Sequence, residues 1–280
     1  MQTLRETLTL EQLTETRFQG WSPDDPAPRI YGGQVIAQAL LAAYATVEGQ
    51  TCHSLHAYFL RAGDPKAAVV LDVERVRDGP TFSTRRVIAS QGDRQILNMG
   101  ASFMVAETGY EHQAPMPDVP PPESLRDDNE AIAEIDPTVI QLRQQQRQVL
   151  DMRSVPPRKP MITAERSEPS QRYWVRAREP LGTDVRLQQA VLAYASDLAM
   201  LSTTMRPHAL TWTTPGLQYA SLDHSLWFHR TSDFGEWHLY DLDSPTASGG
   251  RGLNRGAYYT ADGTLIASVA QESILRMPAR

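Results

Sequence analysis

The sequence contains a single cysteine, Cys52, among its 280 residues. One cysteine cannot form a disulfide within the chain, and such a low number is typical of proteins in a reducing compartment. Lysine is almost as scarce, because Lys66 and Lys159 are the only two and all other basic side chains are arginine. Arginine suits phosphate recognition, but a base bias in the genome explains the preference equally well.

An excess of positive charge and long apolar runs are also missing. The formal net charge is −6 at pH 7, so the chain has no general attraction for nucleic acid or anionic membranes. The most apolar segment, Val35–Val47, is too short to span a bilayer. No secretory signal follows Arg5 and Glu6, and the ending Met277–Arg280 is not a peroxisomal address. The sequence therefore predicts a soluble, cytoplasmic protein without nucleic-acid or membrane partners.

The remaining composition is ordinary for a globular protein, with 41% apolar and 21% charged residues. A chain of this length can bury a large core and suits one large domain or two small ones. Its first strong pattern is Gln34–Val47, which is apolar nearly all the way round and predicts a helix wrapped by the rest of the fold. Gly32 and Gly33 precede it, and they predict either a tight turn with close packing or an anion or oxyanion site at the helix start.

Strand-like runs separated by turn signals follow this helix and indicate antiparallel strands. They are His53–Leu60, Ala68–Arg77, Thr81–Gln91 and Ile96–Ala106. We expect residues 1–110 to form one unit. Residues 111–166 differ in character, since they hold clustered prolines and a charged, Gln-rich segment, and they predict a linker with a surface helix.

The second half, residues 167–280, repeats the order of the first. A largely apolar segment, Leu187–Met200, predicts a second buried helix. The strands expected after it are Leu217–Arg230, Glu236–Ser244, Gly252–Thr260 and Thr264–Leu275. Local matches support a duplication, for example His53-Ser54-Leu55 with His224-Ser225-Leu226. The predicted class is α+β, with two tandem units that each curl a sheet round one helix.

Three polar residues occupy apolar elements of the second half. Ser221 lies on the inward side of the strand predicted over Leu217–Arg230, Asp197 lies within the apolar helix, and Gln271 lies within the last strand. A buried hydroxyl needs hydrogen-bond partners, because leaving it unpaired costs about 1 kcal/mol or more. We therefore expect these three side chains, the polar trio, to form one site. The alternative for Asp197 is a buried residue that caps a neighbouring loop, which would be favoured without Ser221 and Gln271.

The chain resembles the acyl-CoA thioesterase II family at several motifs that occur in the same order. In the first half these are Tyr31–Val35, His53–Arg61 and Arg77–Gly79. In the second half they are Tyr194–Leu198, Asp223–Arg230 and Ala270–Glu272. The resemblance covers nearly the whole chain outside the linker. It implies a double hotdog fold, a homo-oligomer (dimer or tetramer), and hydrolysis of fatty acyl-CoA to free acid and CoA.

The resemblance also assigns roles to the polar trio. The family activates water with an Asp on the second helix, a Thr or Ser on the next strand and a Gln on the last strand, which match Asp197, Ser221 and Gln271. Relatives often carry Thr where this chain has Ser221, so the hydroxyl is retained and a methyl group is lost. Asp197 would accept a proton from water while the other two orient it. This chemistry needs no cofactor, metal or covalent intermediate.

Several rival sites have weaker support. Covalent catalysis by Ser221 would normally need a GxSxG elbow, which the sequence lacks. A Cys52 thiol nucleophile beside His53 is disfavoured, because adjacent strand residues point to opposite faces. His53 and His56 lack the companions of a metal site, although His56 could line a pocket. Gly249–Gly252 opens no helix and favours a hairpin over a phosphate cradle. Two alternative functions are a hotdog hydratase or dehydratase, which would pair an Asp with a His, and a non-catalytic acyl-CoA-binding protein.

Overall fold

The computed structural model describes residues 3–23, 27–133, 149–155 and 165–277. Within these ranges the strands form one antiparallel sheet whose main path runs β1-β2-β4-β5-β6-β3-β10-β13-β12-β11-β8-β7, with β9 also paired to β13. The first-half strands are β1 (Glu11–Gln12), β2 (Arg17–Gly20), β3 (Thr51–Phe59), β4 (Val69–Asp78), β5 (Phe82–Gln91) and β6 (Arg94–Met104). The others are β7 (Leu150–Val155), β8 (Ser170–Ala177), β9 (Gln218–Ser221), β10 (Asp223–Phe228), β11 (His238–Ser248), β12 (Arg251–Thr260) and β13 (Leu265–Arg276).

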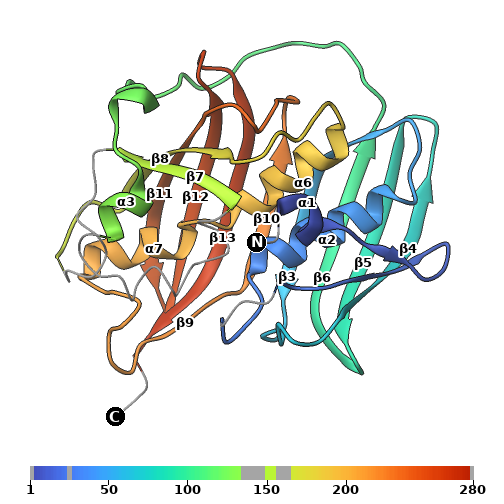
Figure 1. Ribbon diagram of the computed structural model, residues 1–280, viewed down its shortest axis with the longest axis horizontal. Helices are drawn as coiled ribbons and strands as arrows, with labels where there is room; N and C mark the ends of the chain where they lie inside the picture. Colours follow the sequence, from blue (N-terminus) through green and yellow to red (C-terminus); the bar gives the residue numbers. More distant parts are fainter. Residues whose placement is uncertain (1–2, 24–26, 134–148, 156–164, 278–280) are drawn as a thin grey trace.

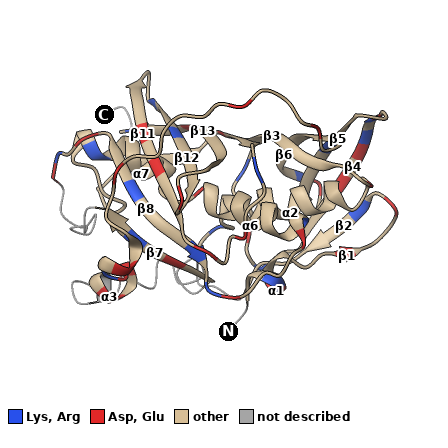
Figure 2. Ribbon diagram, turned by 90° about the horizontal axis from the view of Figure 1, so that it is seen from above, with Lys and Arg blue, Asp and Glu red and all other residues tan. Residues whose placement is uncertain are grey.

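Two central helices, α2 (Gly32–Tyr44) and α6 (Val185–Ser196), pack against each other on the inner face of this sheet (Figure 1). They run antiparallel, since Tyr31 at the start of α2 contacts Tyr194 near the end of α6, and Tyr44 at the end of α2 hydrogen-bonds Gln189. α2 carries no charged residue and is tan throughout in Figure 2. Its Ile36, Ala39 and Leu40 are fully buried, as its uniformly apolar sequence predicted.

The smaller helices lie around this centre. They are α1 (Leu4–Leu8), α3 (Asp128–Ala133) and α7 (Met200–Met205), with 3-10 turns η1 (Pro122–Ser124) and η2 (Arg206–His208). None of the described helices is both long and apolar enough to cross a membrane.

The predicted duplication is confirmed by the topology. After α2, strands β3 to β6 take the spatial order β4-β5-β6-β3, and after α6, strands β10 to β13 take the equivalent order β11-β12-β13-β10. Each half is an antiparallel sheet curled round one helix, so the α+β double hotdog architecture is as predicted. The halves join through β3 and β10, where Leu55 pairs directly with Leu226. These leucines are the matched residues of the two His-Ser-Leu segments, so the halves are related by a pseudo-twofold axis through this pair.

Residues 106–125, within or next to the predicted linker, cross the outer side of the sheet from β6 toward α3 (Figures 1 and 2). Met116, Val119 and Leu125 pack on a second apolar cluster formed by Trp174, Trp237, Leu239 and Tyr259. The segment is also held by hydrogen bonds, because the Trp174 indole donates to Pro120 O at 2.9 Å. We call residues 106–125 the strap.

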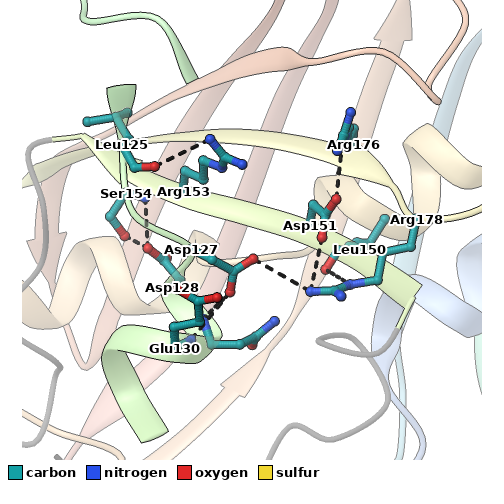
Figure 3. Close-up of polar contacts among 11 residues, drawn as sticks. Leu125, Asp127, Asp128, Glu130, Leu150, Asp151, Arg153, Ser154, Arg176 and Arg178 are labelled. Carbon is teal, nitrogen blue, oxygen red and sulfur yellow. Dashed lines mark hydrogen bonds and ion pairs between the residues drawn. The ribbon is translucent and has the colours of Figure 1, made fainter. Parts of the chain in front are cut away.

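The predicted linker range also contains a strand, β7, which pairs with β8 at the edge of the sheet. Figure 3 shows how α3 docks on this edge: the backbone N–H and the hydroxyl of Ser154 donate to the carboxylate of Asp128 at 2.8 and 2.6 Å. Arg178 pairs with Asp151 at 3.0 Å and lies 3.6 Å from Asp127. The Asp128 carboxylate thus occupies the backbone N–H of Ser154 on this edge strand, one of the groups that would otherwise be free to pair. The rest of the helical content predicted for the linker falls on residues 134–148, outside the described residues.

Candidate active site

Asp197 lies between two helices rather than within one. The prediction of a single helix over Leu187–Met200 is wrong in this respect, because α6 ends at Ser196, Asp197 is its C-cap, and α7 begins only at Met200. Ala199 separates them with a left-handed backbone (φ 62°), a conformation that is uncommon for residues other than glycine. Because of this break, Asp197 is a half-buried residue at the end of α6 rather than a residue in the middle of a longer helix.

The start of α2 holds this carboxylate from the other half of the molecule. The Gly33 N–H donates to Asp197 Oδ2 at 3.0 Å, and the positive end of the α2 dipole favours a negative charge there. Glycine is needed at both neighbouring positions, because a Cβ on Gly32 would lie 2.8 Å from Asp197 Oδ2 and one on Gly33 would overlap the carbonyl oxygen of Tyr194. The close-packing reading of the glycine pair is therefore confirmed, and the Gly33 N–H is occupied by the Asp197 carboxylate rather than left bare.

Three tyrosines lie around Asp197, of which Tyr31 is partly buried and Tyr240 and Tyr258 are fully buried. Tyr31 donates its hydroxyl to Tyr194 O at 2.9 Å, and Tyr240 donates to Ser196 O at 2.6 Å. Burial, followed by the negative charge of Asp197, raises the pKa of Tyr31 and of Tyr258 well above the usual value. These phenols consequently stay neutral over the physiological range, and Asp197 is the acidic group that they surround.

Ser221 and Gln271 are in direct contact, as the sequence predicted for members of one site. Gln271, on β13, is 1% exposed, and its Nε2 donates to Ser221 Oγ at 2.8 Å. Ser221 ends β9 and is half-buried, so its hydroxyl is satisfied on the protein side and still borders accessible space. Ser221 lies next to the seam between the halves, where β3 pairs with β10. The neighbouring Leu222 O accepts a hydrogen bond from Phe59 N across this seam at 2.9 Å.

The single strand predicted over Leu217–Arg230 is broken at Leu222. Ser221 is paired with Ser273 but Ser225 with Ala270, so the register along β13 shifts by one residue between them. The shift changes which side chains face inward, as at other bulges. Before it Ser221 faces the site, and after it the even-numbered residues, beginning with His224, are buried.

His224 is the residue that sequence reasoning missed. It is fully buried, its Nδ1 lies 2.6 Å from Gln271 Oε1, and its Nε2 lies 2.8 Å from Ser196 Oγ. Burial lowers the pKa of His224 to about 4, although its hydrogen bond to Gln271 acts in the opposite direction. The alternation of His224 with Leu226 and Phe228 was a signal of an inward position, hidden by the one-residue shift at Leu222.

Two members of the polar trio, Ser221 and Gln271, contact each other, and two further buried side chains extend from Gln271 toward α6. Gln271 contacts Ser221 directly, and it is connected through His224 to Ser196, the residue that precedes Asp197. The arrangement brings a carboxylate, a hydroxyl and an amide from three elements to the seam between the halves. Groups of these types can accept a proton from a water molecule and fix its orientation.

The rival sites fit the structure less well. Cys52 is buried, and burial raises the pKa of its thiol, which disfavours a thiolate nucleophile. Asp223 and His224 point to opposite faces of β10, so they do not form the pair that a dehydratase would need. In the described part of the chain, no three His, Cys, Asp or Glu side chains are grouped to hold a metal ion. Gly249 and Gly250 form the β11–β12 turn with positive φ angles, as the hairpin reading predicted.

Comparison with known proteins identifies the family. A family model described as acyl-CoA thioesterase matches residues 143–274, and one described as acyl-CoA thioesterase N-terminal domain matches residues 20–104. The human acyl-coenzyme A thioesterase 8 is 41% identical over 96% of this chain and 88% of its own length. The chain belongs to the acyl-CoA thioesterase family. The resemblance seen in the sequence motifs is thereby confirmed.

Other members of the thioesterase family agree in sequence and in structure. The acyl-CoA thioesterase 2 of Haemophilus influenzae is 37% identical over 96% of this chain and 95% of its own. The crystal structure of an acyl-CoA thioesterase II from Mycobacterium marinum is similar with a TM-score of 0.82 and 39% identity, covering 98% of each chain. A polyketide synthase dehydratase domain matches with a TM-score of 0.55 but only 13% identity, and that likeness concerns the fold alone.

Proposed function

We propose that this protein hydrolyses fatty acyl-CoA to the free fatty acid and CoA. The observation that carries the proposal is the buried Gln271 amide that donates to Ser221, in a chain that also holds the Asp197 carboxylate on the Gly33 N–H and whose relatives are acyl-CoA thioesterases. The same residues argue against a non-catalytic acyl-CoA-binding protein, since binding alone gives no reason to bury an amide and a histidine behind the Ser221 hydroxyl.

In the proposed mechanism Asp197 is the general base and water is the nucleophile. Ser221 and Gln271 hold the water, whose oxygen attacks the thioester carbonyl carbon while Asp197 takes one of its protons. The tetrahedral intermediate then collapses with cleavage of the C–S bond. Its leaving thiolate has a conjugate acid of pKa about 8.5, so departure requires little acid assistance, and the proton on Asp197 returns to solvent or thiolate. The Gly33 N–H stabilises and orients the base in this scheme, because it donates to Asp197.

A thiol-release assay tests the proposal. The purified protein is expected to release free CoA from medium- or long-chain acyl-CoA in the presence of a chelator and without nucleotide. A series from short to long acyl chains defines the preferred length. If no member of the series yields thiol while acyl-CoA still binds in calorimetry, the protein is a binding protein and the proposal fails.

We also expect a cytoplasmic homo-oligomer, a dimer or tetramer. The cytoplasmic location is supported by the sole, buried Cys52. The sheet uses β3 and β10 to join its own halves, and Asp128 occupies the backbone N–H of Ser154 on the edge strand β7, which favours association through faces over pairing at that residue. Light scattering at micromolar concentration should give a multiple of the 31.3 kDa chain mass. A strictly monomeric mass would contradict this expectation.

A further inference from the structure

A continuous chain of buried polar groups leads from α6 to the site hydroxyl. Ser196 Oγ lies 2.8 Å from His224 Nε2, His224 Nδ1 lies 2.6 Å from Gln271 Oε1, and Gln271 Nε2 lies 2.8 Å from Ser221 Oγ. Ser196 and His224 have no exposed surface, and Gln271 is 1% exposed. Only the Ser221 end of this chain reaches the half-exposed part of the site.

The direction of each hydrogen bond follows from the chemistry of the amide. An amide oxygen can only accept and an amide nitrogen can only donate, so the Oε1 of Gln271 requires a proton on His224 Nδ1. Burial lowers the pKa of His224 to about 4, and the ring is therefore neutral at pH 7 with Nε2 as an acceptor. In this tautomer the Ser196 hydroxyl faces two acceptors, Ala193 O at 2.9 Å and His224 Nε2 at 2.8 Å, and its single proton is shared between them.

We infer that His224 is a positioning residue for thioester hydrolysis, which holds the Gln271 amide in the orientation that donates to Ser221. The inference rests on the proposed function, because its consequence concerns the water that this site would activate. Ser221 Oγ accepts a hydrogen bond from the Gln271 amide, so its own O–H remains available to donate into the site. With the amide reversed, Ser221 would have to donate to Gln271 and could offer the site only lone pairs. His224 thus sets the hydrogen-bond character of Ser221 without touching substrate.

Two other histidines serve as matched controls. His238 is also fully buried and bonded to a serine, with Nε2 2.7 Å from Ser232 Oγ, and burial lowers its pKa to about 4 as well. It lies on β11, away from the trio. His53 is the counterpart of His224 in the first half by sequence match, and its ring contacts Ser102 at 2.8 Å. Loss of either ring tests what a histidine contributes to the fold alone.

Kinetics of substituted proteins test the inference. His224→Asn keeps an N–H donor near the place of Nδ1, whereas His224→Leu removes it. We expect His224→Leu to lower kcat about tenfold, the rate equivalent of one lost hydrogen bond, with KM little changed, and His224→Asn to restore most of kcat. His238→Asn and His53→Leu should leave kcat at the wild-type value. An unchanged kcat in His224→Leu, or no recovery in His224→Asn when both are folded, overturns the inference.

A measurement on the unsubstituted protein does not depend on the variants folding. ¹⁵N-histidine NMR at neutral pH distinguishes the two neutral tautomers, and the ring signals of His224 are assigned through its own backbone resonances in the unsubstituted protein. The expected state carries the proton on Nδ1. A proton on Nε2 would mean a reversed Gln271 amide and would overturn the inference. Absence of hydrolysis by the wild-type protein would instead remove the proposed function, so the two failures are distinguishable.

Discussion

At the scale of single residues, the proposed chemistry depends on the charge of Asp197. Asp197→Asn keeps the shape and can still face the Gly33 N–H through its amide oxygen, but it removes the base. We expect kcat to fall by roughly 10²–10⁴, the usual contribution of general-base catalysis, while the melting temperature changes little. Steady-state thiol release measures the loss, and circular dichroism provides the folding control.

Substitutions of Ser221 separate water activation from covalent catalysis. Ser221→Thr keeps the hydroxyl and should retain most activity, whereas Ser221→Ala should lie between the wild type and Asp197→Asn, because a water can replace part of one lost hydrogen bond. A nucleophilic serine predicts a different order, with Ser221→Ala as inactive as Asp197→Asn. It also predicts an acyl adduct on Ser221 in mass spectra together with burst kinetics, and that observation would replace the mechanism.

Two buried histidines make stability depend on pH. Burial lowers the folded-state pKa of His224 and of His238 from 6.5 to about 4. Between these values the unfolded chain binds protons that the folded protein does not, so stability falls as pH falls from 6.5 toward 4. From pH 7 to pH 5.5 we expect a loss on the order of 1 kcal/mol per histidine, measured by urea unfolding. His238→Asn should remove its share of this loss; an identical pH dependence in that variant would contradict the assignment.

At the scale of elements, the contact between the start of α2 and the end of α6 is tight enough to require glycine. Gly33→Ala would ordinarily stabilise a helix by up to about 1 kcal/mol, but here the new methyl group overlaps Tyr194 O. We expect instead a net destabilisation of about 1–3 kcal/mol, typical of overpacking, and a lower kcat because the Gly33–Asp197 hydrogen bond is displaced. Gly100→Ala is the control, since nothing lies within 4 Å of its added Cβ.

The sequence predicted the long periodic elements well and their interruptions poorly. Helix α2 and strands such as β5 and β12 lie within a few residues of their expected bounds because one repeating pattern spans each of them. The end of α6 was placed too late, since neither Ser196 nor Asp197 is a residue that stops a helix and the stop depends on the left-handed Ala199. Such a backbone conformation is set by tertiary packing, not by local propensity.

The candidate site shows the same division. Asp197, Ser221 and Gln271 could be singled out because each is a polar residue in an apolar stretch, and the family resemblance linked them. His224 was not linked to them, because a single strand over Leu217–Arg230 with Ser221 inward would turn His224 outward, and the one-residue register shift at Leu222 reverses that alternation. Strand β8 was also not predicted from the sequence. This strand packs Tyr173 into the main core and Trp174 into the second apolar cluster on the opposite face of the sheet.

At the scale of the whole molecule, the two repeated halves form one common core and one continuous sheet. Buried residues of both halves belong to a single core cluster, including Ile36 and Leu55 from the first and Val191 and Leu226 from the second. The sheet continues across β3 and β10, and the base Asp197 in one half is held by Gly33 in the other. The residue ranges 1–110, 111–166 and 167–280 therefore remain a proposed division of the sequence, and the site would need both halves.

This architecture leads us to expect one cooperative unfolding transition. Exposing the seam would uncover the apolar faces of both α2 and α6, so neither half should unfold while the other stays intact. Four of the five tryptophans (Trp174, Trp212, Trp227 and Trp237) lie in the second half, whereas far-ultraviolet circular dichroism reports on the strands and helices of both. The fluorescence, dichroism and activity-loss midpoints in urea should coincide. Separate midpoints for fluorescence and dichroism would show that the halves unfold independently.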